Sequence, residues 1–265
     1  MKKKDSLIRK SLFNILPFET YLWVLSKLYL YSYKTGILRN NPFFEYQYFL
    51  KKVIKKGDTC IDIGANLGYY SVPMAKLAGK EGKVYAIEPV KPVLKVLRAN
   101  TKRFDNIEIL PYALGQENKT ISLGNNTMKS KGYIASGSHF ILDKNSRAND
   151  DVDIEFDAEM RNPNELFSDL NRLDFIKCDV EGYEVYIIPE MESLIMKFRP
   201  ILFVETNGEA RKQIMDLFHK NNFQTFVLKD GIMIEDKGDK KGDLIIIPDE
   251  KTSEFHRFMH NQQSE

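Results

Sequence analysis

The chain has 265 residues and a mass of 30.8 kDa, enough for one large hydrophobic core or for a core with a small accessory segment. Hydrophobic residues make up 43% and charged residues 29%, a balance that excludes a largely disordered or collagen-like chain. The two cysteines, Cys60 and Cys178, are too few for a disulfide framework or a four-cysteine zinc site. Their apolar neighbours favour buried, reduced thiols in a cytoplasmic protein.

Residues 1–56 differ from the rest of the chain. They carry twelve Lys and Arg against three Asp and Glu, and they hold twelve aromatic residues. The spacing of Leu, Trp and Tyr over 22–33 predicts an amphipathic helix, and a second helix is expected over 42–56. We expect this extension either to cap the main domain or to contact an anionic membrane surface. Charged residues interrupt its apolar stretches, so neither a signal peptide nor a membrane span is expected.

Strands and helices alternate from Gly57 to about residue 250. Strands are expected at 59–63, 83–88, 107–110, 173–178 and 201–205, helices at 67–79, 89–104, 183–198 and 209–221, and a strand pair at 223–228 and 244–248 around the turn-rich 229–242. This order predicts an α/β fold with a doubly wound, mostly parallel sheet and an antiparallel C-terminal strand. Residues 116–160 are expected to form a loop or lid insertion, with a long loop over 124–150, and residues 251–265 a polar tail.

The turn after the first strand carries the strongest functional signal, Asp62-Ile-Gly-Ala-Asn-Leu-Gly68. Gly64 and Gly68 permit a sharp turn and a close approach to a ligand at the carboxyl end of a strand, where open α/β sheets bind ligands. The next strand ends in Glu88, whose carboxylate can accept hydrogen bonds from both hydroxyls of a ribose. Together these residues predict a cofactor that contains a nucleoside.

The charges around this turn favour one such cofactor. Asn66 stands where the dinucleotide fingerprint G-x-G-x-x-G has its second glycine, and Asp62 would repel a pyrophosphate. S-adenosylmethionine has an ammonium, a sulfonium and a ribose but no phosphate, so Asp62 and Glu88 favour it. A nicotinamide-dependent oxidoreductase is the alternative among enzymes, and a glycine turn that binds nothing is the alternative without function.

Two acids, Asp179 and Glu181, follow the fourth strand at the same sheet edge and are the candidate catalytic residues. They could orient the acceptor, act as general base or hold a divalent cation. Alternatively, Asp179 caps the following helix and Glu181 is solvated. A magnesium site that adds Glu205 and Asn207 to Asp179 is conceivable but not favoured. His139 could serve as a base near neutral pH, although a lone loop histidine is more often solvated.

Four runs in this order, 62–71, 84–89, 113–115 and 177–184, resemble the FkbM-type family of S-adenosylmethionine-dependent methyltransferases. The run Asp179-Val-Glu-Gly-Tyr-Glu184 is the most distinctive, and Cys178 stands where the family usually has Ile. The resemblance covers about 57–205, continues weakly to 248 and leaves out 1–56. It implies a Rossmann-like class I methyltransferase fold and O-methylation of a sugar, a glycan or glycolipid, or a secondary metabolite. The cofactor-binding residues expected on this basis are Asp62, Gly64, Asn66, Gly68, Glu88 and Ala113.

The acceptor stays open at this point. Methyl transfer is an in-line displacement, so we expect positioning of a small-molecule or saccharide acceptor to supply much of the acceleration. Methylation of nucleic acid is suggested by the basic segment and disfavoured by the acidic main domain. A catalytically silent cofactor-binding module of the same fold is the remaining alternative. We expect a cytoplasmic enzyme that could contact the membrane peripherally.

Overall fold

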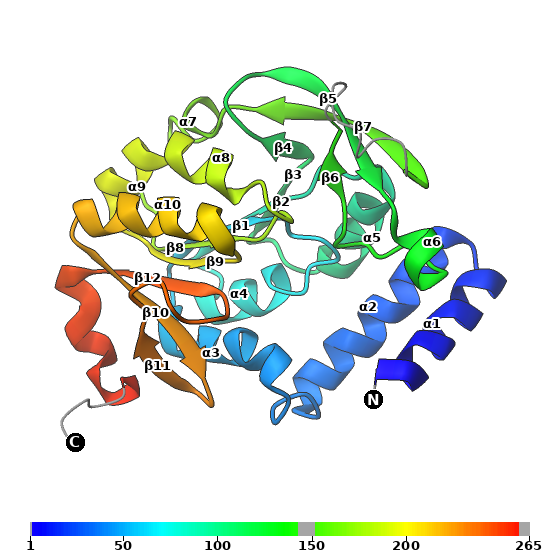
Figure 1. The fold of residues 1–265 in the computed structure, drawn as a ribbon, viewed down its shortest axis with the longest axis horizontal. Coiled ribbons are helices and arrows are strands. Elements are labelled where there is room, and N and C mark those ends of the chain that lie inside the picture. The colour runs from blue at the N-terminus through cyan, green and yellow to red at the C-terminus, as the bar shows by residue number, and fades with distance from the viewer. Residues whose placement is uncertain (1, 143–151, 260–265) are drawn as a thin grey trace.

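The computed structural model describes residues 2–142 and 152–259, and Figure 1 shows their arrangement around a large central sheet. That sheet has eight strands in the order β11-β10-β12-β9-β8-β1-β2-β3, and a smaller sheet has the order β4-β7-β5-β6. The strands of the large sheet are β1 (Thr59–Ile63), β2 (Lys83–Ile87), β3 (Ile107–Leu110), β8 (Phe175–Cys178), β9 (Ile201–Val204), β10 (Phe223–Lys229), β11 (Ile232–Glu235) and β12 (Leu244–Pro248).

The pairing confirms the predicted doubly wound sheet. Strands β1, β2, β3, β8 and β9 run parallel, while β12 is antiparallel to both of its neighbours, β9 and β10. Strands β8, β9 and β12 are buried at every position, as expected for strands covered on both faces. The strand order reverses between β1 and β8, which places a ligand crevice at the carboxyl ends of these two strands.

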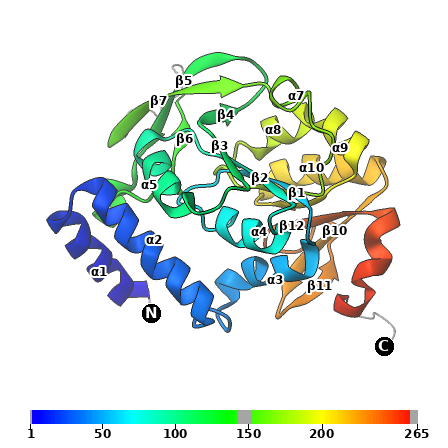
Figure 2. The same cartoon turned by 180° about the vertical axis from the view of Figure 1, so that it is seen from behind.

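Helices cover both faces of the large sheet (Figures 1 and 2). One face packs against α8 (Glu184–Glu190), α9 (Glu192–Phe198) and α10 (Gly208–Lys220), and the other against α3 (Glu45–Val53), α4 (Ser71–Ala78) and α5 (Lys91–Thr101). The predicted helix over 183–198 is two helices instead. Pro189 lies inside α8, where it lacks a backbone donor, and the chain restarts as α9 after Met191.

The predicted long loop over 124–150 is wrong for the part that the structure describes, while 143–151 lie outside the described residues. The insertion forms the smaller sheet instead, which Figure 1 shows above the carboxyl ends of the central strands. The smaller sheet consists of β4 (Tyr112–Leu114), β5 (Lys119–Asn125), β6 (Phe140–Ile141) and β7 (Ile154–Arg161). The short helix α6 (Thr127–Lys131) lies between β5 and β6 in the chain, and α7 (Pro163–Leu166) follows β7. Strands β5 and β7 pair in antiparallel register from Lys119↔Met160 to Asn125↔Ile154.

The segment 229–242 also contains more structure than its turn residues suggested. Strand β11 forms a hairpin with β10 there, with Lys229 opposite Ile232. The buried side chain of Arg211 holds the rest of the segment, because its guanidinium contacts Asp236 at 2.5 Å and donates to the Gly242 carbonyl at 2.6 Å. The chain then continues from β12 into the 3-10 helix η3 (Asp249–Phe258), which buries Phe255.

The N-terminal residues form α1 (Lys2–Ile15), which the sequence pattern did not reveal, then α2 (Phe18–Thr35), the short η1 (Pro42–Phe44) and α3. Helix α2 packs on α5, where Asn100 donates hydrogen bonds to Ser26 Oγ and to the Leu67 carbonyl, both at 2.9 Å. Gln47 on α3 accepts from the Tyr29 hydroxyl and donates to the Tyr69 carbonyl. The extension is therefore hydrogen-bonded to the glycine turn. Within the described ranges, no helix has the combined length and apolarity needed to cross a bilayer.

Candidate cofactor and acceptor site

A cavity of ≈ 2620 Å³ opens at the carboxyl ends of β1, β2, β8 and β9. Its volume exceeds the roughly 300–1,000 Å³ of a typical single-ligand pocket, so there is space for two ligands side by side. One end is lined by the turn after β1 and by Glu88, and the other end reaches helix α2 and η1. The smaller sheet contributes a third wall, which includes residues 133–142.

The turn after β1 is pressed against the loop that carries the catalytic candidates. Gly64 has φ +76°, and a Cβ there would lie 1.9 Å from the backbone oxygen of Asp179, so no side chain fits. Asn66 also has positive φ, lines the cavity, and keeps a buried Oδ1 without a hydrogen-bond partner. Gly68 does not line the cavity and instead packs closely against Leu97 on α5. The turn therefore offers the cavity an unused acceptor at Asn66.

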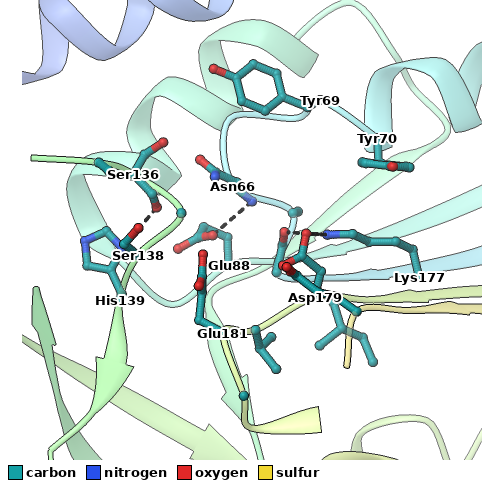
Figure 3. Close-up of a pocket in the computed structure, with 18 of the residues that line it drawn as sticks. Asn66, Tyr69, Tyr70, Glu88, Ser136, Ser138, His139, Lys177, Asp179 and Glu181 are labelled. Carbon is teal, nitrogen blue, oxygen red and sulfur yellow. Dashed lines mark hydrogen bonds and ion pairs between the residues drawn. The ribbon is translucent and has the colours of Figure 1, made fainter. Parts of the chain in front are cut away.

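Glu88 lies at the end of β2 with its carboxylate fixed by two backbone donors, as Figure 3 shows for the bond from Asn66. Its two oxygens accept from Asn66 N at 3.0 Å and from Val90 N at 2.9 Å. Burial raises the pKa of Glu88 to about 7, although both hydrogen bonds oppose the shift. Each oxygen keeps lone pairs for a ligand hydroxyl. Ala113 also lines the cavity.

Asp62 and Lys177 are directly opposite in the register of β1 and β8, so their side chains lie on the same face of the sheet. The Asp62 side chain is fully buried, accepts from Ser71 Oγ at 2.5 Å, and has Oδ1 3.9 Å from Lys177 Nζ. Asp62 does not line the cavity. An ammonium does lie beside Asp62, as its charge suggested, but in this structure it belongs to Lys177.

Lys177 links this buried carboxylate to the acids at the cavity. Its Nζ lies 2.9 Å from Asp179 Oδ2 and 3.3 Å from the Gly64 carbonyl, and it faces the ring of Tyr70 at 5.1 Å (Figure 3). Burial disfavours its charged form, but the carboxylates of Asp179 and Asp62 outweigh burial and raise the pKa of Lys177. Lys177 is thus a permanent positive charge at the base of the site. Sequence reasoning gave it no role, although a lysine inside the buried strand Phe175–Cys178 was the available signal.

Asp179 and Glu205 share a hydrogen bond at the cavity wall. This bond, burial and the charge of Asp179 raise the pKa of Glu205 to about 9. Burial alone would raise the pKa of Asp179, but Lys177 and the bond from Glu205 lower it overall. At neutral pH, Glu205 therefore donates its proton to an ionised Asp179. Burial and the charge of Asp179 raise the pKa of the neighbouring Asp243 to about 6.

Glu181 and His139 approach the site from two directions (Figure 3). Glu181 is exposed, has φ +57°, and faces Gly137 of the insertion, where a Cβ would lie 3.8 Å from its Oε1. His139 is not solvated as a loop histidine would be. Burial lowers its pKa to about 4, its Nδ1 lies 3.0 Å from the Ser136 carbonyl, and its buried Nε2 has no partner.

The magnesium set considered from the sequence is only partly assembled. Asp179 and Glu205 meet, but Asn207 does not line the cavity, and the Lys177 ammonium contacts Asp179. Among the residues that the structure describes, no group of three or more His, Cys, Asp and Glu side chains is arranged to hold a metal ion.

This combination of strand order, glycine turn, strand-end carboxylate and acidic loop agrees with the fold and site expected for a class I S-adenosylmethionine-dependent methyltransferase. The pattern of the methyltransferase FkbM domain matches residues 62–225, and the chain belongs to that family. The domain matched over residues 62–225 is thus a methyltransferase domain, for which S-adenosylmethionine is the cofactor.

The chain also resembles curated methyltransferases, and it spans less than two thirds of the length of two protein-L-isoaspartate O-methyltransferases among them. The chain is 30% identical over 157 residues to a protein-L-isoaspartate O-methyltransferase from Ignicoccus hospitalis, covering 57% of this chain and 63% of that protein. It is 29% identical over 153 residues to a "Probable cobalt-precorrin-6B C(15)-methyltransferase (decarboxylating)" from Saccharolobus solfataricus, covering 54% and 72%. The match spans only 29% of a second protein-L-isoaspartate O-methyltransferase, from Methanosarcina mazei.

Solved structures with a related chain path include an FkbM methyltransferase from Methylobacillus flagellatus. It is 12% identical, with 90% of this chain and 57% of that chain covered and a TM-score of 0.46. Another is Aeropyrum pernix fibrillarin with bound S-adenosyl-L-methionine, at 13% identity, 74% and 68% coverage and a TM-score of 0.43.

The residues of the site fit the cofactor. Glu88 offers two fixed oxygens to ribose hydroxyls, and the orphaned Asn66 Oδ1 offers a further acceptor at the turn. Gly64 lies so close to the Asp179 backbone that only main-chain atoms occupy this part of the cavity wall. The direct partner for the cofactor's ammonium, expected at Asp62, is not at the cavity surface.

Proposed function

We propose that the protein transfers the methyl group of S-adenosylmethionine to a hydroxyl oxygen of a neutral, hydroxyl-rich acceptor such as a saccharide, a glycolipid or a secondary metabolite. The observation that carries the proposal is the ionised Asp179 carboxylate, which lines the cavity and is held from behind by Lys177 and Glu205. Such a carboxylate accepts a hydrogen bond from a hydroxyl and so fixes the direction of its lone pairs.

The charge of the acceptor end supports a neutral substrate. Asp179, Glu181 and Asp243 all line the cavity together with one buried lysine, Lys177, whereas the other basic side chains of the lining are not buried: Arg9, Lys119, Lys229, Lys240 and Lys241. A carboxylate acceptor, as in an isoaspartyl peptide, or a phosphate-rich nucleic acid would be repelled there. A protonated amine would be attracted, but its nitrogen has no free lone pair to attack a methyl group. A hydroxyl satisfies both conditions.

When bound, the cofactor would supply a methyl group on a cationic sulfonium, whose sulfur departs as a neutral thioether without acid assistance. The remaining work falls to the protein. In our proposal Glu88 and Asn66 hold the nucleoside end, and Asp179 orients the acceptor hydroxyl. The Asp179–Glu205 pair holds one proton at neutral pH, so it can take a second from the acceptor oxygen. Asp62 acts indirectly, by holding Lys177 in place.

The test is to incubate the enzyme with fractionated cell extracts and isotopically labelled methyl donor, and to identify labelled products by mass spectrometry. We expect label on an ether oxygen of a neutral hydroxyl compound, and we expect Asp179→Asn to abolish it while cofactor binding persists. Label on a carboxyl ester, an amine or a nucleic acid would refute the assignment.

A further inference from the structure

The exposed apolar side chains are concentrated at one end of the molecule. Eight of the eleven large exposed hydrophobic residues within the described ranges lie in the first 43 residues. We call these eight the outer face: Leu7, Ile8, Ile15, Trp23, Leu28, Tyr31, Ile37 and Phe43. Soluble monomers rarely expose apolar residues in such a cluster unless a partner covers them.

The exposure of this face does not result from loose packing of the helices that carry it. Helix α2 buries Tyr21, Leu22 and Ser26 against the body of the protein, so its inner side is fully used. Trp23 and Tyr31 lie on its other side, at helical spacing from Lys27 and Lys34. Figures 1 and 2 show α1 on the outer edge of the molecule, beside α2.

Positive charge accompanies the apolar residues. Lys27 stacks its ammonium over Trp23 at 5.6 Å, and the charges of Arg103 and Lys102 act on it. Lys76 in turn experiences the charges of Arg103 and Lys34. No salt bridge to a carboxylate is found for any of these five basic residues within the part of the chain described. This mixture of aromatic, aliphatic and unneutralised basic side chains is complementary to an anionic lipid surface, where lipids supply both the negative charge and the apolar interior.

The outer face is continuous with the cavity. Ile8, Leu28 and Phe43 are exposed at the surface and also line the cavity that contains Glu88 and Asp179. Leu25, Tyr29, Leu38 and Phe44 extend the apolar lining inward from them. An amphipathic acceptor could therefore keep its apolar chain on this lining while its polar head reaches the acids.

We propose that the outer face docks on an anionic lipid bilayer and that the acceptor is a lipid-borne hydroxyl compound that enters the cavity over Leu28 and Phe43. The second part rests on the proposed function, whereas docking itself does not. A bilayer provides one flat partner for the apolar side chains of the outer face, and its anionic headgroups provide counterions for Lys27 and Lys34.

The test uses the full chain and vesicles of phosphatidylcholine with or without phosphatidylglycerol. We expect co-sedimentation only with the anionic vesicles, and we expect it to fade as salt is raised from about 50 mM to about 500 mM. The variant Ile15→Ser/Tyr31→Ser/Ile37→Ser changes side chains that are 77%, 65% and 70% exposed and do not line the cavity. It should weaken partitioning at least about tenfold.

A control changes an exposed apolar residue outside the N-terminal helices. Ile232→Ser, on β11 and at 42% exposure, should leave partitioning unchanged. Thermal unfolding and cofactor titration confirm that all variants fold. Absence of binding to anionic vesicles at low salt, or equal binding by both variants, would overturn the docking proposal.

The acceptor part is tested by separating labelled products into lipid and aqueous fractions. Label in the lipid fraction, reduced in the triple variant, supports the inference. Label confined to water-soluble compounds overturns it and leaves O-methylation intact. Absence of label from both fractions counts against the proposed function and the acceptor part together, while vesicle binding, which needs no catalysis, is still judged on its own result.

Discussion

Replacing Lys177 with Met tests whether its ammonium holds the site together. Met has similar length and apolar volume, so the change removes the charge and leaves little cavity. It leaves two carboxylates without their shared cation: Asp62, which is fully buried with Oδ1 3.9 Å from Nζ, and Asp179, whose carboxylate lies at 2.9 Å and is 37% exposed. Of the two, Asp62 has no access to water and bears the larger cost.

The magnitude follows from these two distances. At an effective dielectric constant of about 20, a charge pair about 4 Å apart interacts by about 4 kcal/mol, and desolvation of Lys177 offsets part of that gain. Breaking a buried pair by removing one partner typically costs about 3–5 kcal/mol. Asp179 can be hydrated and keeps its hydrogen bond from Glu205. We therefore expect a loss near the lower bound, about 3 kcal/mol in the free energy of unfolding.

The loss should depend on pH with a definite sign. Burial already raises the pKa of Asp62 although Lys177 opposes it, whereas at Asp179 Lys177 and Glu205 together outweigh burial. Removing Lys177 therefore moves both folded-state pKa values upward. Folding is then disfavoured above those raised values, and the penalty diminishes as acid protonates the carboxylates. Urea unfolding at about pH 8 should show the full loss, and at about pH 5 the variant should approach the wild type.

An exposed pair of equal length provides the control. Lys83 and Glu108 also lie 2.9 Å apart, but with side chains 38% and 48% exposed, so Lys83→Met should cost less than about 1 kcal/mol. If Lys177→Met destabilises the protein no more than Lys83→Met, or by the same amount at both pH values, Lys177 does not hold the two carboxylates in the way described.

Three further predictions concern the turn and the acids. Glu88→Gln should weaken S-adenosylmethionine binding by up to about a hundredfold at about pH 8. The affinity of the wild type should fall as the pH drops through the Glu88 pKa of about 7, since ribose hydroxyls donate better to the carboxylate. Calorimetry of the variant should show no such pH dependence. Gly64→Ala should cost at least about 2 kcal/mol in chemical denaturation, whereas Gly36→Ala, with a similar φ of +79° but open space around it, should show only the backbone strain of about 1 kcal/mol. Asp179→Asn should lower turnover at least about a hundredfold, with a smaller effect on cofactor affinity. Glu181→Gln should lower turnover less, because the Glu181 side chain is exposed. Equal losses of turnover in the two variants, measured in steady-state assays, would contradict the assigned roles.

The large sheet could be predicted because its local signals agree with its tertiary environment. Buried strands such as β1 and β9 are short apolar runs between turn residues, and each is followed by a helix with an apolar face. The sequence of the smaller sheet also contains a strand pattern, but turn-forming residues surround it. In β7, Ile154, Phe156, Ala158 and Met160 alternate with charged residues, the period of a half-buried strand. The neighbouring Gly, Asn and Ser favoured a loop interpretation for the whole insertion.

Contacts across the site could not be predicted in the same way. Sequence spacing places Asp62 and Asp179 at the same edge of the sheet. Only the parallel register shows that Lys177 lies opposite Asp62, so that Asp62 pairs with this lysine and not with a ligand. Similarly, the raised pKa of Glu205 depends on its hydrogen bond with Asp179, and the two residues follow different strands. His139 is neutral because the insertion buries it, a property of the folded smaller sheet and not of the residues beside it.

The N-terminal helices connect the outer face to the cofactor turn through two buried links. Ser26 on α2 and Leu67 in the turn share the amide of Asn100, and Gln47 on α3 joins Tyr29 on α2 to Tyr69 just before α4. Tyr29 and Tyr69 also pack with ring centroids 4.2 Å apart. Because these contacts are on the inner side of α2, they do not compete with a partner on its outer side. The same helix can therefore brace the glycine turn and present Trp23 and Tyr31 outward, so that capping and membrane contact, posed as alternatives by the sequence, are physically compatible.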